Sequence, residues 1–385
     1  MTHRAPELVV VGNGASGRKF LTSAREHGLT DCFRIRTLDE HADGRIVGAH
    51  HGLTPERETV VALDPARHVL RTASGRSMPY DALVLATGKR LSPMDYSGTH
   101  PVGWYRYCVP ADLAEIQHEA VHHRRAVVVG GGRRGLKAAA LLQKLGLQTQ
   151  IVEQAARLLP AWVDDTGGLA LQSRIAKRGI ETQLGVSVTD LLSLEGRLAS
   201  VRLSNGSEIT ADLLVFCPKI RARDELGRAS GLKLGDRDGI AIDEHCQSND
   251  PDVFVVGSAA SFNGHCLNWP AAEDMTAETA ARALAGKSST LGALESHAKF
   301  RALGVDIATF GDSFGRAPDS VEISVFDSVA NSYARLAVTE DGRLLTGGML
   351  VGRVGAYRQL LDCYQRHLVL PTRPGALVRM LAENT

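Results

Sequence analysis

The sequence lacks several features that would narrow its function at once. Charge of one sign is not in excess, because 44 Lys and Arg residues stand against 43 Asp and Glu residues. A near-neutral chain offers no broad field for nucleic acid or an anionic membrane. The apolar runs, such as residues 8–11 and 126–129, are far too short to span a bilayer. No apolar signal segment precedes the first strand-like run, so we expect a cytoplasmic protein with neither a nucleic-acid nor a membrane partner.

Closely spaced cysteines are also missing. The chain has six cysteines, which lie far apart and form no Cys-x-x-Cys pair. This spacing argues against a zinc knuckle, an iron–sulfur ligand set or a thioredoxin-like redox pair. We therefore expect no metal site and ordinary reduced thiols, and Cys266, next to His265, is the one candidate for a reactive thiol.

Glycine, in contrast, is abundant. The chain of 385 residues contains 39 glycines, about one in ten, against a usual ~7%. Hydrophobic residues make up 44% of the chain, which is ample for a core and excludes a disordered protein. The length predicts two or three domains at roughly 100–200 residues each.

The first glycine loop spans residues 12–17, between an apolar strand and a helix predicted over residues 18–27. Gly12 permits a tight turn, Gly14 lets the backbone approach a pyrophosphate, and Gly17 lets helix and strand pack closely. The N-terminus of the helix presents free N–H groups and a partial positive charge to phosphates. The pattern predicts a dinucleotide site.

A second loop, at residues 130–135, repeats this order between a strand at 126–129 and a helix predicted over 136–145. Its sequence is Gly-Gly-Gly-Arg-Arg-Gly, so the three fingerprint glycines are again present. Two such loops in one chain predict two nucleotide sites, one for a flavin and one for a nicotinamide dinucleotide.

Acidic residues follow both loops at the distance where they bind ribose hydroxyls. Asp39 and Glu40 come after the first loop, and Glu153 comes after the second. Gln154 stands where an arginine would suit a 2′-phosphate, which favours NADH over NADPH.

The remaining patterns give the fold class. We predict an α/β protein with two Rossmann-like dinucleotide-binding domains and a small C-terminal α+β domain. The C-terminal prediction rests on three alternating strands followed by a helix, at residues 321–326, 333–339, 343–350 and 356–367.

Further segments carry a family resemblance. Residues 80–88 (YDALVLATG) and 250–257 (DPDVFVVG), together with the loops, resemble the two-dinucleotide-binding flavoproteins that act as pyridine-nucleotide-dependent reductases. Residues 297–312 and 347–352 are similar to the flavoprotein half of assimilatory NAD(P)H nitrite reductase. The resemblance covers nearly the whole chain.

This resemblance implies a domain plan and a set of cofactor-binding residues. It implies an FAD domain at residues 1–110 and 239–290, an NAD(H)-binding-like domain at 111–238, and an α+β interface domain at 291–385. The residues implied or predicted to bind the two cofactors are Gly12, Gly14, Ala15, Ser16, Gly17, Asp39, Glu40, Ala86, Thr87, Gly88, Gly257 and Ser258 for FAD, and Gly130, Gly132, Gly135 and Glu153 for NADH.

Several positions depart from the family pattern. Ser258 replaces an acidic residue that holds the ribityl chain of FAD, so we expect weaker flavin binding. Lys137 replaces a glutamate, Lys219 replaces a glycine near the nicotinamide, and Arg133 and Arg134 fill apolar loop positions. The second site is therefore open to three interpretations: a relic NAD site, a site for a more anionic ligand, or solvated surface charges.

The catalytic residues are not identified by any motif. His50 and His51 are candidates for acid–base chemistry, since histidine titrates near neutrality, although a solvated loop pair is the plainer interpretation. Trp269 opens a predicted helix, and the resemblance places it by the flavin, with ordinary packing as the alternative.

Our leading hypothesis is a reductase that takes hydride from NADH and passes electrons to a separate protein or small-molecule acceptor. The cysteine spacing cannot supply an iron–sulfur cluster, so we expect no unaided nitrite reduction. Two alternatives stay open. One is a flavoenzyme of specialised metabolism with a degenerate NAD site that acts directly on a small substrate. The other is a non-catalytic nucleotide-binding protein whose C-terminal domain offers a partner or homodimer surface.

Overall fold

The structure, a computed structural model, describes residues 5–39, 53–92, 94, 99–108, 110–236, 238–267, 270–291 and 297–370. The chain forms two compact units, which are described one at a time below. The first comprises Met1–Ser92 and Ile220–Leu294, and the second comprises Pro93–Lys219 and Glu295–Thr385.

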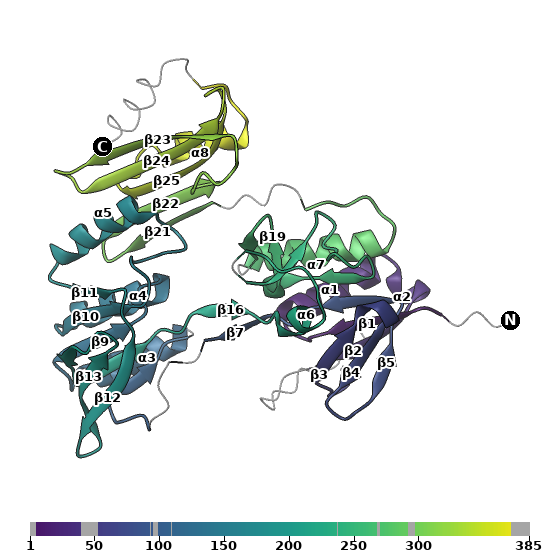
Figure 1. Ribbon diagram of the computed structural model, residues 1–385, viewed down its shortest axis with the longest axis horizontal. Coiled ribbons are helices and arrows are strands. Elements are labelled where there is room, and N and C mark those ends of the chain that lie inside the picture. Colours follow the sequence, from purple (N-terminus) through teal and green to yellow (C-terminus); the bar gives the residue numbers. More distant parts are fainter. Residues whose placement is uncertain are drawn as a thin grey trace. The chain divides into compact units, whose positions relative to one another are not determined.

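A four-stranded parallel sheet in the order β18-β6-β1-β2 forms the centre of the first unit (Figure 1). Its strands are β1 (Glu7–Val11), β2 (Arg34–Leu38), β6 (Ala82–Leu85) and β18 (Val253–Val255). The apolar residues of β1 and β6 are buried on both faces, as expected when helices cover a parallel sheet. Because β18 comes from beyond residue 250, the second nucleotide fold is inserted within the first, as predicted.

Helices α1 (Ala15–Glu26) and α7 (Pro270–Leu284) pack against each other in this unit. Phe20 and Leu21 of α1 are buried in the core that the sheet shares with α7. Two short helices complete the helical part, α2 (Leu29–Cys32) and α6 (Glu225–Ala229).

Smaller sheets surround this core. The strands β3 and β4 form the predicted antiparallel pair, and a 3-10 turn at Pro65–Arg67 joins them. The strands of these sheets are β3 (Val60–Asp64), β4 (Val69–Thr72) and β5 (Ser77–Pro79); β7 (Lys89–Leu91) and β16 (Ile220–Ala222); and β17 (Ile240–Ile242), β19 (Ala260–Phe262) and β20 (His265–Cys266).

The second unit has a five-stranded parallel sheet in the order β11-β10-β9-β15-β8. Its strands are β8 (Trp104–Arg106), β9 (Arg125–Val129), β10 (Gln148–Glu153), β11 (Glu181–Leu184) and β15 (Leu213–Phe216). Its helices are α3 (Pro110–Ala120), α4 (Arg133–Lys144) and α5 (Asp165–Ala176). A three-stranded antiparallel sheet adds β12 (Val188–Leu194), β13 (Arg197–Leu203) and β14 (Glu208–Thr210).

The C-terminal part of the second unit is a five-stranded antiparallel sheet in the order β21-β22-β25-β24-β23, with helix α8 against it. The predicted meander and final helix are confirmed, and β21 and β22 add a hairpin. The elements are β21 (Ala298–Ala302), β22 (Val305–Gly311), β23 (Ser320–Asp327), β24 (Ser332–Thr339), β25 (Leu345–Gly352) and α8 (Tyr357–Gln365).

Helix α5 lies against the C-terminal sheet, where it contacts β22, β24 and β25 (Figure 1). The Asp164 carboxylate, which caps α5 through the Gly167 N–H, also accepts hydrogen bonds from Tyr333 Oη at 2.8 Å and Arg335 Nη1 at 3.0 Å. Arg174 donates to the main-chain oxygens of two residues before β24. A hydrophobic core is shared between the nucleotide fold and the C-terminal sheet.

The units meet in sequence at residues 92–93, 219–220 and 294–295, whereas the predicted domain boundaries fall at 110–111, 238–239 and 290–291. The reason is strand pairing. β8, at Trp104–Arg106, pairs with β15 of the second unit, and β16, at Ile220–Ala222, pairs with β7 of the first. The division into three domains stays a prediction.

Candidate nucleotide sites

The first glycine loop connects β1 to α1 at the carboxyl end of the sheet. Gly12 has φ +107°, and a Cβ atom there would lie 2.2 Å from the Ala86 carbonyl oxygen. A Cβ at Gly17 would lie 2.1 Å from the Gly12 oxygen, whereas a Cβ at Gly14 would meet nothing within 4 Å. Gly12 and Gly17 are therefore required by the fold itself, and Gly14 leaves open space in front of α1.

The N-terminus of α1 is available to an anion. Gly14 is its N-cap, no side chain caps the helix, and the first turn contains no acidic residue. The neighbouring Asn13 is 2% exposed, and both polar atoms of its side chain lack a hydrogen-bond partner among the described residues. Buried amides are normally paired, so this one indicates a polar ligand. The cradle fits the diphosphate of a dinucleotide.

The other residues predicted for this site follow the carboxyl ends of β2, β6 and β18. Ala86 contacts Gly12, Thr87 donates to the Arg223 oxygen at 2.7 Å, and Gly88 has φ +77°. Gly257 has φ +69°, and a Cβ there would lie 2.0 Å from Ser16 Oγ.

Asp39 is half-buried directly after β2, and its N–H donates to the Glu56 oxygen at 2.9 Å. Four of the predicted site residues, Glu40, His50, His51 and Trp269, lie outside the described residues.

Ser258 brings in two residues that no sequence motif identified. Its hydroxyl donates to Glu273 Oε1, and Lys89 Nζ donates to the same oxygen at 2.9 Å. Glu273 comes from α7, and Lys89 from β7, so only the folded chain brings them to Ser258. Their spacing in the sequence carries no signal of this contact.

The second loop, between β9 and α4, repeats the geometry of the first. Gly130 has φ +113°, and a Cβ there would lie 2.7 Å from the Cys217 oxygen. A Cβ at Gly135 would lie 1.6 Å from the Gly130 oxygen, and one at Gly132 would meet nothing within 4 Å. Gly132 is the N-cap of α4, without a side-chain cap or an acid in the first turn. The chain thus contains two equivalent cradles.

Glu153, at the end of β10, is buried beside the second cradle. Its carboxylate accepts the Gly131 N–H at 2.6 Å and the Ala155 N–H at 2.7 Å. Lys219 Nζ lies 3.9 Å from Glu153 Oε1, so the lysine side chain reaches from beyond β15 to the carboxylate.

The basic residues of the second loop do not form one anion-binding cluster. Arg134 donates to the Cys108 oxygen at 3.2 Å and the Pro218 oxygen at 2.6 Å, so it ties two loops together. The Arg133 guanidinium lies over the rings of Phe300, 4.4 Å from its centroid, and Trp162, 5.2 Å away. Burial lowers the pKa of Arg133. Lys137 is exposed on α4.

A family model described as pyridine nucleotide-disulphide oxidoreductase matches residues 49–283, more than half of the chain. The chain belongs to this family. The fold of two Rossmann-like domains and the expectation of an oxidoreductase that works with FAD and a pyridine nucleotide are thereby confirmed at the level of the family.

Similar proteins agree with this assignment. The nitrite reductase [NAD(P)H] large subunit of Klebsiella oxytoca is 32% identical over 99% of this chain and 42% of its own length. The nitrite reductase (NADH) large subunit of Escherichia coli is 32% identical over 83% of this chain and 38% of its own length. This chain therefore spans about two fifths of the length of these two relatives. The predicted resemblance to nitrite reductase is confirmed.

Solved structures show the same fold. A covalent putidaredoxin reductase–putidaredoxin complex superimposes with a TM-score of 0.68 at 21% identity, covering 98% of this chain and 99% of the other. At this level of identity the likeness supports the fold alone.

The six cysteines are spread over both units as free thiols. All six cysteines are described, and none forms a disulfide. Burial and the nearby Asp238 raise the pKa of Cys266 to about 12, which disfavours its thiolate, the reactive form of a cysteine. The described residues contain no group of three or more His, Cys, Asp or Glu side chains that could hold a metal. Within the same residues, no helix is long and apolar enough to cross a membrane.

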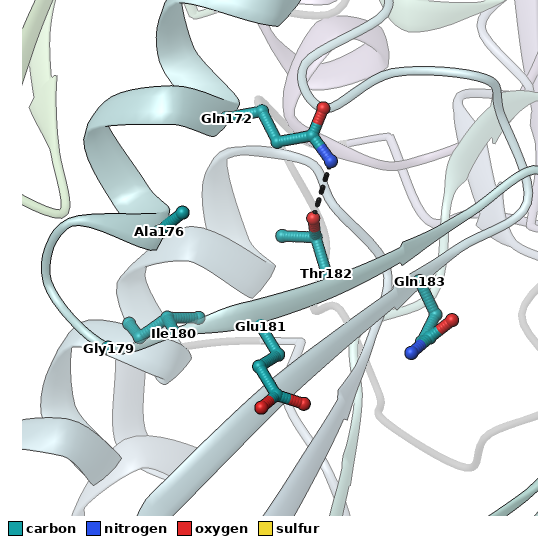
Figure 2. Close-up of a pocket in the computed structure, with 7 residues that line it drawn as sticks. All are labelled: Gln172, Ala176, Gly179, Ile180, Glu181, Thr182 and Gln183. Atoms are coloured by element: carbon teal, nitrogen blue, oxygen red, sulfur yellow. Dashed lines mark hydrogen bonds between the residues drawn. The ribbon is translucent and has the colours of Figure 1, made fainter.

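A pocket of about 450 Å³ in the second unit lies at the start of β11, at the opposite end of the sheet from the second cradle (Figure 2). Gln172 Nε2 donates to Thr182 Oγ1 at 2.8 Å at its wall. The glycine loops occupy the carboxyl end of the parallel sheets, where ligands of such folds bind, whereas Gly179 and Glu181 precede or begin their strand. We assign no function to this pocket.

Proposed function

We propose that this chain is an FAD-dependent oxidoreductase that oxidises NADH and passes the electrons to a separate acceptor. The observation that carries the proposal is the pair of equivalent cradles at Gly12–Gly17 and Gly130–Gly135 within one member of this family. FAD, when bound, supplies the capacity to accept hydride from a nicotinamide and to give up electrons singly or in pairs.

In this proposal the first cradle holds FAD. The uncapped amides of α1 bind the diphosphate, and the open space at Gly14 allows the close approach. Asp39 binds the ribose hydroxyls of the adenosine, with Glu40 as the second candidate. The residues that line the remaining part of the cofactor are Asn13, Ala15, Ser16, Gly17, Ala86, Thr87, Gly88, Gly257 and Ser258.

The second cradle, in the same proposal, holds NADH. Gly132 and the amides of α4 bind its diphosphate, and Glu153 binds the adenosine ribose. Because Glu153 is an anion, it disfavours the 2′-phosphate of NADPH. Lys219 must leave Glu153, or share it, when the ribose hydroxyls bind.

The acceptor is proposed as a redox protein or a small molecule. The solved complex of putidaredoxin reductase with putidaredoxin supports a protein acceptor, because that structure has the same fold.

One observation favours a second candidate function. The ion pair between Lys219 and Glu153 occupies the ribose position of the second cradle, as expected if that site no longer takes NADH. The protein would then be a flavoenzyme that acts directly on a small substrate.

An anaerobic absorbance experiment separates these functions. The purified protein, reconstituted with FAD where needed, is expected to be yellow and to lose its absorbance near 450 nm when NADH is added. A yellow protein that NADH does not bleach would favour the second candidate. A colourless protein that takes up no FAD would favour a binding role without redox chemistry.

A further inference from the structure

Helix α7 places a carboxylate next to the loop that follows β18. Glu273 Oε1 accepts hydrogen bonds from both Ser258 Oγ and Lys89 Nζ. The Glu273 side chain is only 13% exposed, and Ser258 is buried. Moving a carboxylate out of water is unfavourable unless it is paired, and here the lysine provides the pairing.

This carboxylate lies beside the first cradle. Gly257 separates β18 from Ser258, and a Cβ atom on Gly257 would lie 2.0 Å from Ser16 Oγ and 4.0 Å from Glu273 Cγ. Ser16 belongs to the first turn of α1, whose amides face the proposed diphosphate. A ligand that is bound at the N-terminus of α1 and extends past Ser16 toward Gly257 therefore lies next to Ser258 and Glu273.

Glu273 retains the capacity to accept further hydrogen bonds. Its Oε1 is used by Ser258 and Lys89, whereas Oε2 accepts none from the residues that the structure describes. An ionised carboxylate offers about four acceptor positions. The hydrogen bonds from Lys89 and Ser258 to Oε1 fix the direction of the carboxylate.

We propose that Glu273, positioned by Ser258 and Lys89, accepts hydrogen bonds from the ribityl hydroxyls of the flavin. The inference rests on the proposed function, which places FAD in the first cradle. In this proposal the carboxylate from α7 compensates for the serine at position 258, where weaker flavin binding was expected. The flavin site is thus completed by a residue that lies 15 positions further along the chain.

Titration of the full-length apoprotein with FAD tests this role, with quenching of flavin fluorescence as the readout. Glu273→Gln keeps the shape of the side chain and removes its charge. We expect this variant to bind FAD about 10- to 100-fold more weakly, the range for loss of hydrogen bonds to a charged group. Asp274→Asn is the matched control, because Asp274 is an exposed carboxylate on the next position of α7. Its dissociation constant for FAD is expected to equal that of the parent.

A double variant tests whether a carboxylate at position 258 can replace that of Glu273 in flavin binding. Ser258→Asp combined with Glu273→Ala is expected to recover flavin affinity to within about threefold of the parent. The melting temperature of each apoprotein is measured in parallel, so that loss of folding is separated from loss of binding.

Two results overturn the proposal. In the first, Glu273→Gln binds FAD as tightly as Asp274→Asn, and its apoprotein melts at a lower temperature. Glu273 then contributes to the stability of the protein through its ion pair and does not bind FAD. In the second, the double variant folds but does not regain affinity for FAD. A carboxylate at position 258 then does not replace the one at position 273 in flavin binding. If the parent protein itself takes up no FAD in the same titration, the proposed function fails, and this inference fails with it.

Discussion

Lys219 Nζ lies 3.9 Å from the carboxylate of Glu153, the residue proposed to bind the adenosine ribose of NADH. The carboxylate is buried and already accepts two main-chain N–H groups, whereas the lysine is half-exposed. The lysine therefore competes with ribose hydroxyls for the same oxygen atoms.

Removal of this competition should strengthen nucleotide binding. We expect Lys219→Ala to lower the dissociation constant for NADH by about two- to fivefold, since a half-exposed ion pair is worth less than ~1 kcal/mol. Lys144→Ala, which removes the same charge from the last turn of α4, serves as the control. Weaker NADH binding by the Lys219 variant alone would show instead that the lysine contacts the nucleotide.

Replacing a glycine in either loop should reduce stability strongly where the fold needs the glycine for close packing, and only slightly where the glycine faces open space. Gly17→Ala and Gly135→Ala place a Cβ atom within 2.1 Å and 1.6 Å of a carbonyl oxygen, so the helix must move away from the strand. We expect each to lower the free energy of unfolding by about 2–4 kcal/mol. Gly14→Ala, with open space and φ −70°, should change the apoprotein by less than ~0.5 kcal/mol. Urea unfolding of the three apoproteins tests this order.

The contact between α1 and α7 should weaken in acid. Ser23 donates to Glu278 Oε2, and His27 Nε2 lies 2.8 Å from Oε1; these hydrogen bonds lower the pKa of Glu278. A carboxyl whose folded-state pKa is depressed stabilises the fold above its unfolded pKa, near 4.5, and loses this contribution as the pH falls through the folded value.

Glu278→Gln removes this titration. The free-energy difference between parent and variant is expected to be at most about 1 kcal/mol at pH 7, because Glu278 is partly exposed, and to shrink below pH 4.5. Urea unfolding across this range gives the difference directly. A difference that stays constant down to pH 3 would contradict the assignment.

Asp164 should anchor the C-terminal sheet to the nucleotide fold. The variant Asp164→Ala loses the N-cap of α5 and removes the acceptor of Tyr333 Oη and of Arg335 Nη1, although Arg335 Nη2 keeps the Phe314 oxygen and Glu322. We expect a loss of about 2–3 kcal/mol in the free energy of unfolding. Asp165→Ala is the control, because its side chain is 84% exposed. Equal stability of the two variants would show that this contact does not hold the domains together.

The parts of the fold that sequence reasoning predicted correctly are those with local signals. Both glycine loops and the C-terminal meander follow from periodicity and from steric rules that act within a few residues. The insertion of the second fold has no such local signal, and it was implied by the family resemblance. Helix α5 escaped prediction because it packs between two sheets and carries Gly167 and Gly168, which allow the close contact with Tyr333 and Arg157. Its sequence therefore shows no clear helical pattern.

The residues of the two candidate sites also differ in how far they could be predicted from the sequence. The loops and Glu153 were predictable because their spacing is dictated by the ligand's phosphates and ribose. Glu273 and Lys89 were not predictable, because they come from other elements of the fold and are not part of the sequence motif. The same applies to Arg134, whose charge suggested an anion site, although it binds two carbonyl oxygens.

The central claim is that the first cradle holds FAD and the second holds NADH. The most direct test is an anaerobic NADH titration of the parent, Gly14→Val and Gly132→Val, followed by absorbance at 450 nm. Both glycines have extended backbones and nothing within 4 Å of a Cβ atom, so both apoproteins should fold. We predict that Gly14→Val is colourless, whereas Gly132→Val is yellow and is not bleached by NADH. A yellow Gly14→Val protein, or a Gly132→Val protein that NADH bleaches as readily as the parent, would contradict the account.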